Sequence, residues 1–285
     1  MNPRLLPEPR EDGLYAGDEV GSWSEDKYTL VGLYDRLFSS GMKNKWASRV
    51  YIDLYSGSGL VKVRNSSKFL WGSPMLALGL NDPFDKYIFC EENPEAISAL
   101  QKRVSAHFPG AHVEFVPGNC DEKIDAICAL IPKASRTNRV LSFCFVDPYD
   151  LSVKFSTIKK IANYFVDFLI LLALHMDANR NQAFYLNPKN TKIDDCLGKI
   201  DWRSRWKNLP EPKRFPRFLA EVYAEQMQSL NYLPVKFELM KQVRSDVKNL
   251  PLYHLALFSR HKLAYEYWQE VLKYGTPQLP LELTD

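Results

Sequence analysis

Five short apolar runs alternate with helical stretches between residues 50 and 174, and this alternation constrains the fold more than any other feature of the chain. The runs are residues 50–54, 87–90, 112–116, 140–146 and 168–173. Alternating strand and helix patterns are typical of a parallel sheet with helices on both faces. The last two runs contain almost no polar residues. We therefore expect them at the centre of the sheet.

Local signals predict where several helices begin. Residues 22–25 read Ser-Trp-Ser-Glu, the sequence of a capping box, and Tyr34 and Phe38 follow on one helix face. Ser73-Pro74 and Asn93-Pro94 each combine a capping residue with a proline. This pair is favoured at an N-cap and the first helical position. We expect a helix at each of these three places.

The second half of the chain interrupts the alternation and then returns to it. Residues 175–230 are polar and basic, which predicts a helical insertion, and apolar runs at 235–239 and 252–258 precede a helix at 262–273. Seven strands, the last antiparallel, predict an α/β Rossmann-like class I methyltransferase fold. The expected organisation is an N-terminal lead (1–22), a cofactor-binding core (23–174), the insertion (175–230) and a C-terminal part that completes the core (231–285).

Composition restricts the class of protein. A chain of 285 residues that is 46% hydrophobic can bury one large core. No central apolar run is long enough to cross a bilayer and the N-terminus lacks the apolar stretch of a signal peptide, so we expect a cytoplasmic protein. The five cysteines form no CxxC pair and no two histidines share the spacing of a metal-binding helix, so we expect no metal site.

Acidic residues and glycines follow the first three predicted strands, where ligands of open parallel sheets bind. They predict a cofactor pocket built from Asp53, Tyr55, Gly57, Gly59, Glu91, Asn119 and Asp121. Glycines at such a place let the backbone approach a ligand closely.

S-adenosylmethionine fits this pocket better than a dinucleotide. Lys62 stands where the dinucleotide motif requires a third glycine, and Asp53 would repel a pyrophosphate but attract a sulfonium and an ammonium. Glu91 is placed to bind ribose hydroxyls, and Asn119 or Asp121 could contact adenine. The alternative is that Asp53 and Asp121 only cap turns and that the glycines only allow a tight turn.

The fourth strand runs directly into Asp147, Pro148 and Tyr149. Amino-group methyltransferases place an [Asp/Asn/Ser]-Pro-Pro-aromatic motif there. Asp147 could accept an N–H of the methyl acceptor, Pro148 would stiffen the turn, and Tyr149 offers a ring on which a base could stack. The three are our candidate catalytic residues. The alternative is a proline turn that ends a buried strand.

The insertion contains a dense cluster of cations with Trp202, Trp206 and Phe215 interleaved. Its candidate nucleic-acid-binding residues are Lys199, Arg203, Arg205, Lys207, Lys213 and Arg214, and only Asp201 and Glu211 oppose them in residues 199–217. Cations beside aromatic rings suit RNA or single-stranded DNA. An ordinary solvated helix whose tryptophans pack on the core is equally compatible with the pattern.

Several blocks resemble the three-Cys-motif partner (TcmP) family, bacterial proteins similar to class I methyltransferases. The blocks are Trp23 with Lys27 and Tyr34, residues 51–59, Gly72-Ser73-Pro74, residues 145–149, Asn179-Arg180 and residues 258–261. Asn119 and Asp121 are exchanged relative to the family, and Asp150 replaces a common glycine. The resemblance implies a partner protein with a three-cysteine motif that is itself similar to radical S-adenosylmethionine proteins.

Three functions are compatible with these patterns. The first is an S-adenosylmethionine-dependent methyltransferase that acts on a nitrogen of a nucleic-acid base, together with the three-cysteine-motif protein. The second is a non-catalytic module of the same fold that binds nucleic acid or scaffolds the partner, in a mobile-element or defence setting. The third is a nuclease-like or processing activity in such a setting.

Overall fold

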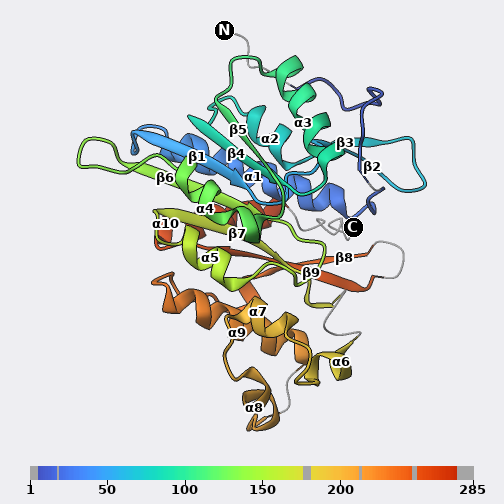
Figure 1. Cartoon of the computed structure of the whole chain (residues 1–285), viewed down its shortest axis with the longest axis vertical. Helices are drawn as coiled ribbons and strands as arrows, with labels where there is room; N and C mark the ends of the chain where they lie inside the picture. Colours follow the sequence, from blue (N-terminus) through green and yellow to red (C-terminus); the bar gives the residue numbers. More distant parts are fainter. Residues whose placement is uncertain (1–5, 18, 176–180, 212–213, 246–248, 275–285) are drawn as a thin grey trace, which may run out of the picture.

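A seven-stranded sheet forms the centre of the molecule (Figure 1). The computed structural model describes residues 6–17, 19–175, 181–211, 214–245 and 249–274. The strand order is β5-β4-β1-β6-β7-β9-β8. The strands are β1 (Ser48–Asp53), β4 (Lys86–Glu91), β5 (Val113–Pro117), β6 (Val140–Val146), β7 (Val166–Leu172), β8 (Lys241–Arg244) and β9 (Pro251–Phe258).

The direction of the strands identifies the fold. β5, β4, β1, β6 and β7 run parallel, whereas β9 is antiparallel to both β7 and β8. This is the sheet of a Rossmann-like class I methyltransferase, which confirms the predicted fold class. Every residue of β6 and β7 is buried, so the prediction that these two strands lie at the centre is also confirmed.

Two apolar cores cover the two faces of the sheet, because successive side chains of a strand point to opposite sides. Tyr51 and Phe143 belong to one core, and their neighbours Ile52 and Cys144 belong to the other. The first core lies under α1 (Ser24–Met42), α2 (Ser73–Leu78), α3 (Pro94–His107) and α10 (Lys262–Tyr274). The second lies under α4 (Cys120–Leu130), α5 (Phe155–Ile161) and the insertion. A small hairpin, β2 (Leu60–Lys62) and β3 (Phe69–Trp71), follows β1.

The insertion after β7 is helical, as predicted. It contains α6 (Gln182–Leu186), α7 (Lys192–Leu197), α8 (Trp202–Lys207) and α9 (Phe215–Ser229). Figure 1 shows α6 and α8 at the lower end of the molecule, far from β1. Asn179 and Arg180 of the family resemblance, and Lys213, lie outside the described residues.

One predicted strand was wrong. Residues 235–239 do not pair with the sheet; a 3-10 turn (Phe237–Leu239) occupies this region, and β8 begins only at Lys241. Of the apolar side chains that suggested a strand, Val235 is buried in the core that also contains α9, and Phe237 packs partly against it, whereas Leu239 is 37% exposed. β8 itself pairs on one side only, so an edge strand with mostly polar residues was not recognised.

Two predicted helix caps were also wrong. The N-cap of α1 is Trp23 rather than Ser22, and the Trp23 side chain makes no capping hydrogen bond. The N-cap of α2 is Gly72 rather than Ser73. The Asn93 cap is confirmed, since its side chain accepts hydrogen bonds from the backbone of Glu95 and Ala96. None of the helices in the described ranges is long and apolar enough to span a membrane.

Candidate cofactor and acceptor site

The glycine loop after β1 uses its two glycines for different purposes. Gly57 (φ +60°) and Gly59 (φ +80°) both adopt the left-handed conformation that favours glycine. A Cβ on Gly59 would lie 2.7 Å from Leu100 Cδ1 and 3.0 Å from Met75 Cγ. A Cβ on Gly57 would meet no atom within 4 Å. Gly59 is therefore required by packing, whereas Gly57 borders open space where a ligand could approach the backbone.

Asp53 is a fully buried carboxylate at the end of β1. Its Oδ2 accepts a hydrogen bond from Ser73 Oγ at 2.6 Å, and its Oδ1 accepts one from Tyr55 N at 3.1 Å. Burial raises the pKa of Asp53 to about 7, against the lowering effect of these two hydrogen bonds. A cationic ligand placed next to this buried carboxyl group would stabilise its charged form.

Ser73 is a site residue that the sequence patterns missed. The serine was expected to cap α2, yet its hydroxyl instead orients the Asp53 carboxylate across 20 positions of sequence. The sequence signal that could have identified it is the Gly72-Ser73-Pro74 block. A helix can start at a proline without a side-chain cap, so the serine beside it could have been assigned another role.

Glu91 joins the end of β4 to the glycine loop. Its Oε2 accepts a hydrogen bond from Gly57 N and its Oε1 accepts one from Asn93 N, both at 2.8 Å. A carboxylate offers about four acceptor positions. About two therefore remain for hydroxyl groups of a ligand. The structure brings the predicted residues Asp53, Gly57 and Glu91 to one edge of the sheet.

Asn119 and Asp121 make the hydrogen bonds of capping residues. The Asn119 side chain accepts a hydrogen bond from Asp121 N at 2.9 Å at the start of α4. The Asp121 carboxylate accepts hydrogen bonds from Thr157 Oγ1 and Lys154 N at the start of α5. Both residues lie after β5 on the same edge as Glu91. Their contact with adenine stays a prediction.

Tyr55 packs partly against the core beside α4. Burial and the neighbouring Cys120 raise the pKa of its phenol far above the usual value, so the hydroxyl stays protonated. Its role in cofactor binding also stays a prediction.

Asp147 lies at the same edge as Asp53 and forms an ion pair. β1 and β6 are adjacent, with Asp53 opposite Phe145, so Asp147 follows two positions beyond that level. Lys27 of α1 donates to Asp147 Oδ2 at 2.6 Å, and the two side chains are only 10% and 14% exposed. Burial acts to lower the pKa of Lys27, but the Asp147 carboxylate outweighs it, and the pKa is raised. Lys27 is therefore charged at any physiological pH.

One aromatic ring lies against this ion pair, and a second follows Asp147 in the turn. The Lys27 ammonium lies 4.6 Å from the centre of the Tyr28 ring. Tyr149, two positions after Asp147, is 82% exposed, whereas Pro148 between them is buried. Asp150 is held by Lys192 of α7 at 2.7 Å. The turn is thus fixed on both sides and presents the Tyr149 ring to solvent. Sequence patterns did not assign a role to Lys27, although it belongs to the block that resembles the TcmP entry helix.

The cations of the insertion are largely paired. Arg203 binds Asp194 at 2.6 Å and Arg205 binds Glu225 at 2.7 Å, while Lys199 lies 4.0 Å from Asp195. Lys207 and Arg214 are exposed. Nucleic-acid binding by these residues stays a prediction, and pairing makes Arg203 and Arg205 less available for it.

The three aromatic side chains interleaved with these cations pack in or against the core. Trp202 and Phe215 are 0% and 3% exposed. Trp206 packs on Phe215 and Phe218 with ring centres 5.0 and 5.2 Å apart. The alternative in which the tryptophans pack on the core is therefore confirmed, and the expectation of aromatic platforms is wrong for Trp202 and Phe215.

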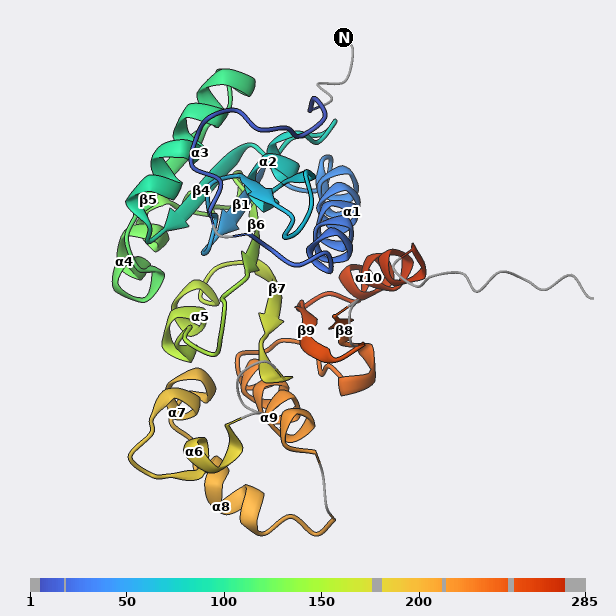
Figure 2. The same ribbon diagram turned by 90° about the vertical axis from the view of Figure 1, so that its right-hand side faces the viewer.

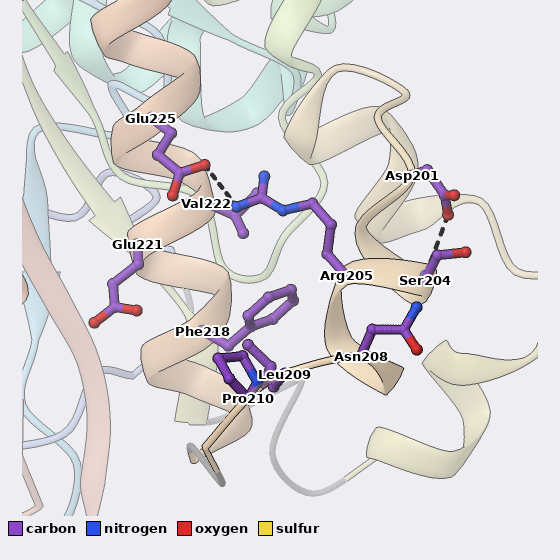
Figure 3. Close-up of a pocket in the computed structure, with 10 residues that line it drawn as sticks. All are labelled: Asp201, Ser204, Arg205, Asn208, Leu209, Pro210, Phe218, Glu221, Val222 and Glu225. Carbon is purple, nitrogen blue, oxygen red and sulfur yellow. Dashed lines mark hydrogen bonds and ion pairs between the residues drawn. The ribbon is translucent and has the colours of Figure 1, made fainter.

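A cavity of about 510 Å³ lies between α8 and α9 (Figure 3). Arg205 reaches across it from α8 toward Glu225 on α9 (Figure 3). All of its lining residues come from the insertion, so it is separate from the glycine loop. In the described ranges, no group of three or more His, Cys, Asp or Glu side chains could hold a metal ion.

Arg203→Gln is expected to lower the free energy of unfolding by about 2–4 kcal/mol, because it leaves the largely buried Asp194 carboxylate without its cation. Arg203 also donates to the carbonyl oxygens of Tyr185 and Asn190. Arg205→Gln is the matched control, since its ion pair is 43% and 52% exposed and should contribute less than about 1 kcal/mol. Urea unfolding measures both. Equal effects of the two substitutions would contradict a structural role specific to Arg203.

Among known proteins, the chain is similar only to solved structures. No protein-family model matches the chain, and no curated protein matches it. The chain is similar to Trm1 from Pyrococcus horikoshii with S-adenosyl-L-methionine, at 10% identity over 94% of this chain and 63% of that one, with a TM-score of 0.46.

Two further similarities are to O-methyltransferases. The Bacillus cereus enzyme in complex with SAH matches at 10% identity over 86% of this chain and 84% of that one, with a TM-score of 0.45. TomG from Streptomyces achromogenes in complex with SAM matches at 10% identity over 79% of each chain, with a TM-score of 0.41. With identities and TM-scores this low, the assignment of the chain to the class I methyltransferase fold rests on its own strand order and directions.

Proposed function

We propose that this protein transfers a methyl group from S-adenosylmethionine to a nitrogen of a nucleic-acid base. The observation that carries the proposal is the Asp147 carboxylate, held by Lys27 at the end of β6 and next to the strand that ends in Asp53 and the glycine loop. Asp147 accepts an N–H of the acceptor and orients the nitrogen lone pair. The exposed Tyr149 ring offers a surface on which the base stacks.

The residues at the glycine loop fit the cofactor. The Asp53 carboxylate attracts the cationic methionine end, the open side of Gly57 lets the backbone approach the ligand, and Glu91 accepts hydrogen bonds from the ribose hydroxyls. When bound there, S-adenosylmethionine supplies an activated methyl group. The transfer then asks little more of the protein than alignment and a hydrogen-bond acceptor for the N–H.

The charge of the acceptor site favours a base over an amine. Lys27 and Asp147 together carry no net charge, and Lys27 stays protonated. Because Lys27 already neutralises Asp147, a cationic acceptor such as a protein lysine would gain no net Coulomb attraction there to offset the loss of its hydration. A neutral, planar base loses less hydration, and it can pair an N–H with Asp147 while its ring lies on Tyr149.

The partner and the compartment are further parts of the proposal. The resemblance to the TcmP family supports a three-cysteine-motif protein as partner. The exposed Tyr149 ring supports either RNA or DNA as substrate. All five cysteines are unbonded, which suits the reducing cytoplasm.

Mass spectrometry of nucleosides tests the proposed function. RNA and DNA from cells with and without this gene and the partner gene are digested, and the methylated nucleosides are compared. The expected result is one methylated base that disappears when this gene is deleted and returns with the parent gene but not with an Asp147→Asn variant. An identical nucleoside content in all strains would contradict the proposal.

The affinity for S-adenosylmethionine is expected to fall as the pH drops below about 7. Asp53 has a pKa raised to about 7, so below that pH it is protonated, and binding of a cation must release this proton. The dissociation constant should then rise by up to about tenfold per pH unit. Calorimetry between pH 5.5 and 7.5 measures it.

The matched control is Asp167→Asn. Asp167 is a second buried carboxylate whose pKa burial raises to about 7, but it lies in β7 beside Ser259. Asp53→Asn should weaken binding and remove the pH dependence, whereas Asp167→Asn should retain it. A pH dependence that survives in Asp53→Asn would show that another group is responsible.

A further inference from the structure

Residues 6–17, which we call the N-terminal strap, lie across α3 and reach the glycine loop (Figure 2). The strap is held by Arg103 of α3, whose side chain is 1% exposed. The guanidinium donates to both carboxylate oxygens of Asp12 at 2.7 Å and to the carbonyl of Tyr15 at 2.9 Å. This bidentate contact is the strong form of an arginine–carboxylate pair.

Arg103 also holds the glycine loop. The nitrogen that binds the Tyr15 carbonyl also donates to the carbonyl oxygen of Ser58 at 2.6 Å, and Ser58 stands between the two left-handed glycines. One buried side chain therefore fixes both the strap and the loop. A shift of the strap should therefore also shift the glycine loop, and a shift of the loop should shift the strap.

Tyr15 closes this connection on the side of Glu91. Its hydroxyl accepts a hydrogen bond from the Asn93 side chain at 3.2 Å. Asn93 N donates to Glu91, which in turn accepts from Gly57 N. Two hydrogen bonds therefore connect Tyr15 to the carboxylate expected to hold the ribose. Tyr15 is also 37% exposed, so a ligand can reach it.

We propose that the N-terminal strap forms one wall of the cofactor site, with Tyr15 in contact with the adenosine half of the cofactor and Arg103 as a positioning residue that couples the strap to the glycine loop. The inference rests on the proposed function, since it takes the glycine loop and Glu91 as the cofactor site. It adds Tyr15, Asp12 and Arg103 to the residues that determine affinity.

The strap can be tested without unfolding the protein because it is also anchored elsewhere. Pro7 accepts a hydrogen bond from the Trp71 indole at 2.8 Å. Beyond the strap, Val20 forms a β-bridge with Val63. Substitution of Tyr15 or Asp12 therefore leaves contacts on both sides in place.

The experiment measures binding of S-adenosylhomocysteine and of adenosine by calorimetry, and dissociation by stopped flow, on the full chain. Tyr15→Ala should raise the dissociation constants of both ligands by about tenfold, because the adenosine half is common to them. Asp12→Asn should speed dissociation of S-adenosylhomocysteine by about tenfold, because the strap detaches more often. Asp125→Asn is the control, since it removes an exposed ion pair with Lys160 far from the strap.

Limited chymotrypsin digestion gives an independent readout. Saturating S-adenosylhomocysteine should slow cleavage after Tyr15 in the parent protein and in Asp125→Asn, and should slow it less in Asp12→Asn. If the parent binds the ligand but the Tyr15→Ala and Asp12→Asn variants bind and release it as the parent does, the inference is wrong and the proposed function stands. If the parent binds neither ligand, the proposed function fails and the inference fails with it.

Discussion

Asp147→Asn is expected to reduce methyl transfer by about a hundredfold or more and to change the affinity for S-adenosylmethionine by less than about threefold. A carboxylate that accepts the acceptor's N–H offsets the positive charge that grows on the nitrogen, so its hydrogen bond acts mainly in the transition state. An amide has the same shape but no charge. Single-turnover methyl transfer to the base identified by the nucleoside comparison measures the rate, and calorimetry measures the affinity.

Asp147→Asn also breaks the ion pair with Lys27. A control must therefore separate its effect on stability from its effect on methyl transfer. Asp147→Asn leaves the largely buried Lys27 ammonium without its counter-charge, which is expected to lower the free energy of unfolding by about 3–5 kcal/mol. The double variant Lys27→Met/Asp147→Asn removes both charges and should recover most of that loss. It should remain as inactive as Asp147→Asn. A double variant that regains the parent rate would show that Asp147 acts on stability alone.

Much of the fold could be predicted because its signals are local. An apolar run between helical stretches marks a buried strand wherever it occurs, and an acid or glycine at its end marks the ligand edge. These rules placed β1 and β4 with the residues that end them, Asp53 and Glu91, and β6 with the residue that follows it, Asp147. They failed for β8, because its four residues, Lys-Gln-Val-Arg, have too few apolar side chains to reveal an edge strand.

The missed site residues depend on contacts between distant parts of the chain. Lys27 and Asp147 are 120 positions apart, and Ser73 and Asp53 are 20 apart. Each residue alone reads as an ordinary helical or capping residue. Only the packing of α1 and α2 against the sheet brings them to the carboxylates, and no spacing rule contains that information.

The basic insertion shows the same limit for charge. Counting residues 199–217 alone gives many cations and two acids. The partners of Arg203, Arg205 and Arg217 are Asp194, Glu225, and Glu221 with Glu238, all outside that window. Part of the local excess of positive charge is therefore taken up in ion pairs once α7, α8 and α9 pack together.

Gly57→Ala and Gly59→Ala are expected to fail in different ways, although they alter neighbouring glycines of one loop. At Gly59 the new methyl group would lie 2.7 Å from Leu100 and 3.0 Å from Met75, which are both fully buried and have no room to move. Left-handed strain and overpacking together should lower the free energy of unfolding by about 2–5 kcal/mol. Urea unfolding measures this loss.

At Gly57 the new methyl group would meet no protein atom, so only the left-handed strain remains, about 1–2 kcal/mol. The methyl group would instead occupy the space through which the backbone approaches the cofactor. We expect Gly57→Ala to stay folded and to bind S-adenosylmethionine at least about tenfold more weakly, which corresponds to 1.4 kcal/mol or more. Calorimetry on the folded variant measures the affinity. Parent-like binding by Gly57→Ala would place the cofactor away from this side of the loop, and the assignment of Asp53 and Glu91 as its ligands would then have to be abandoned.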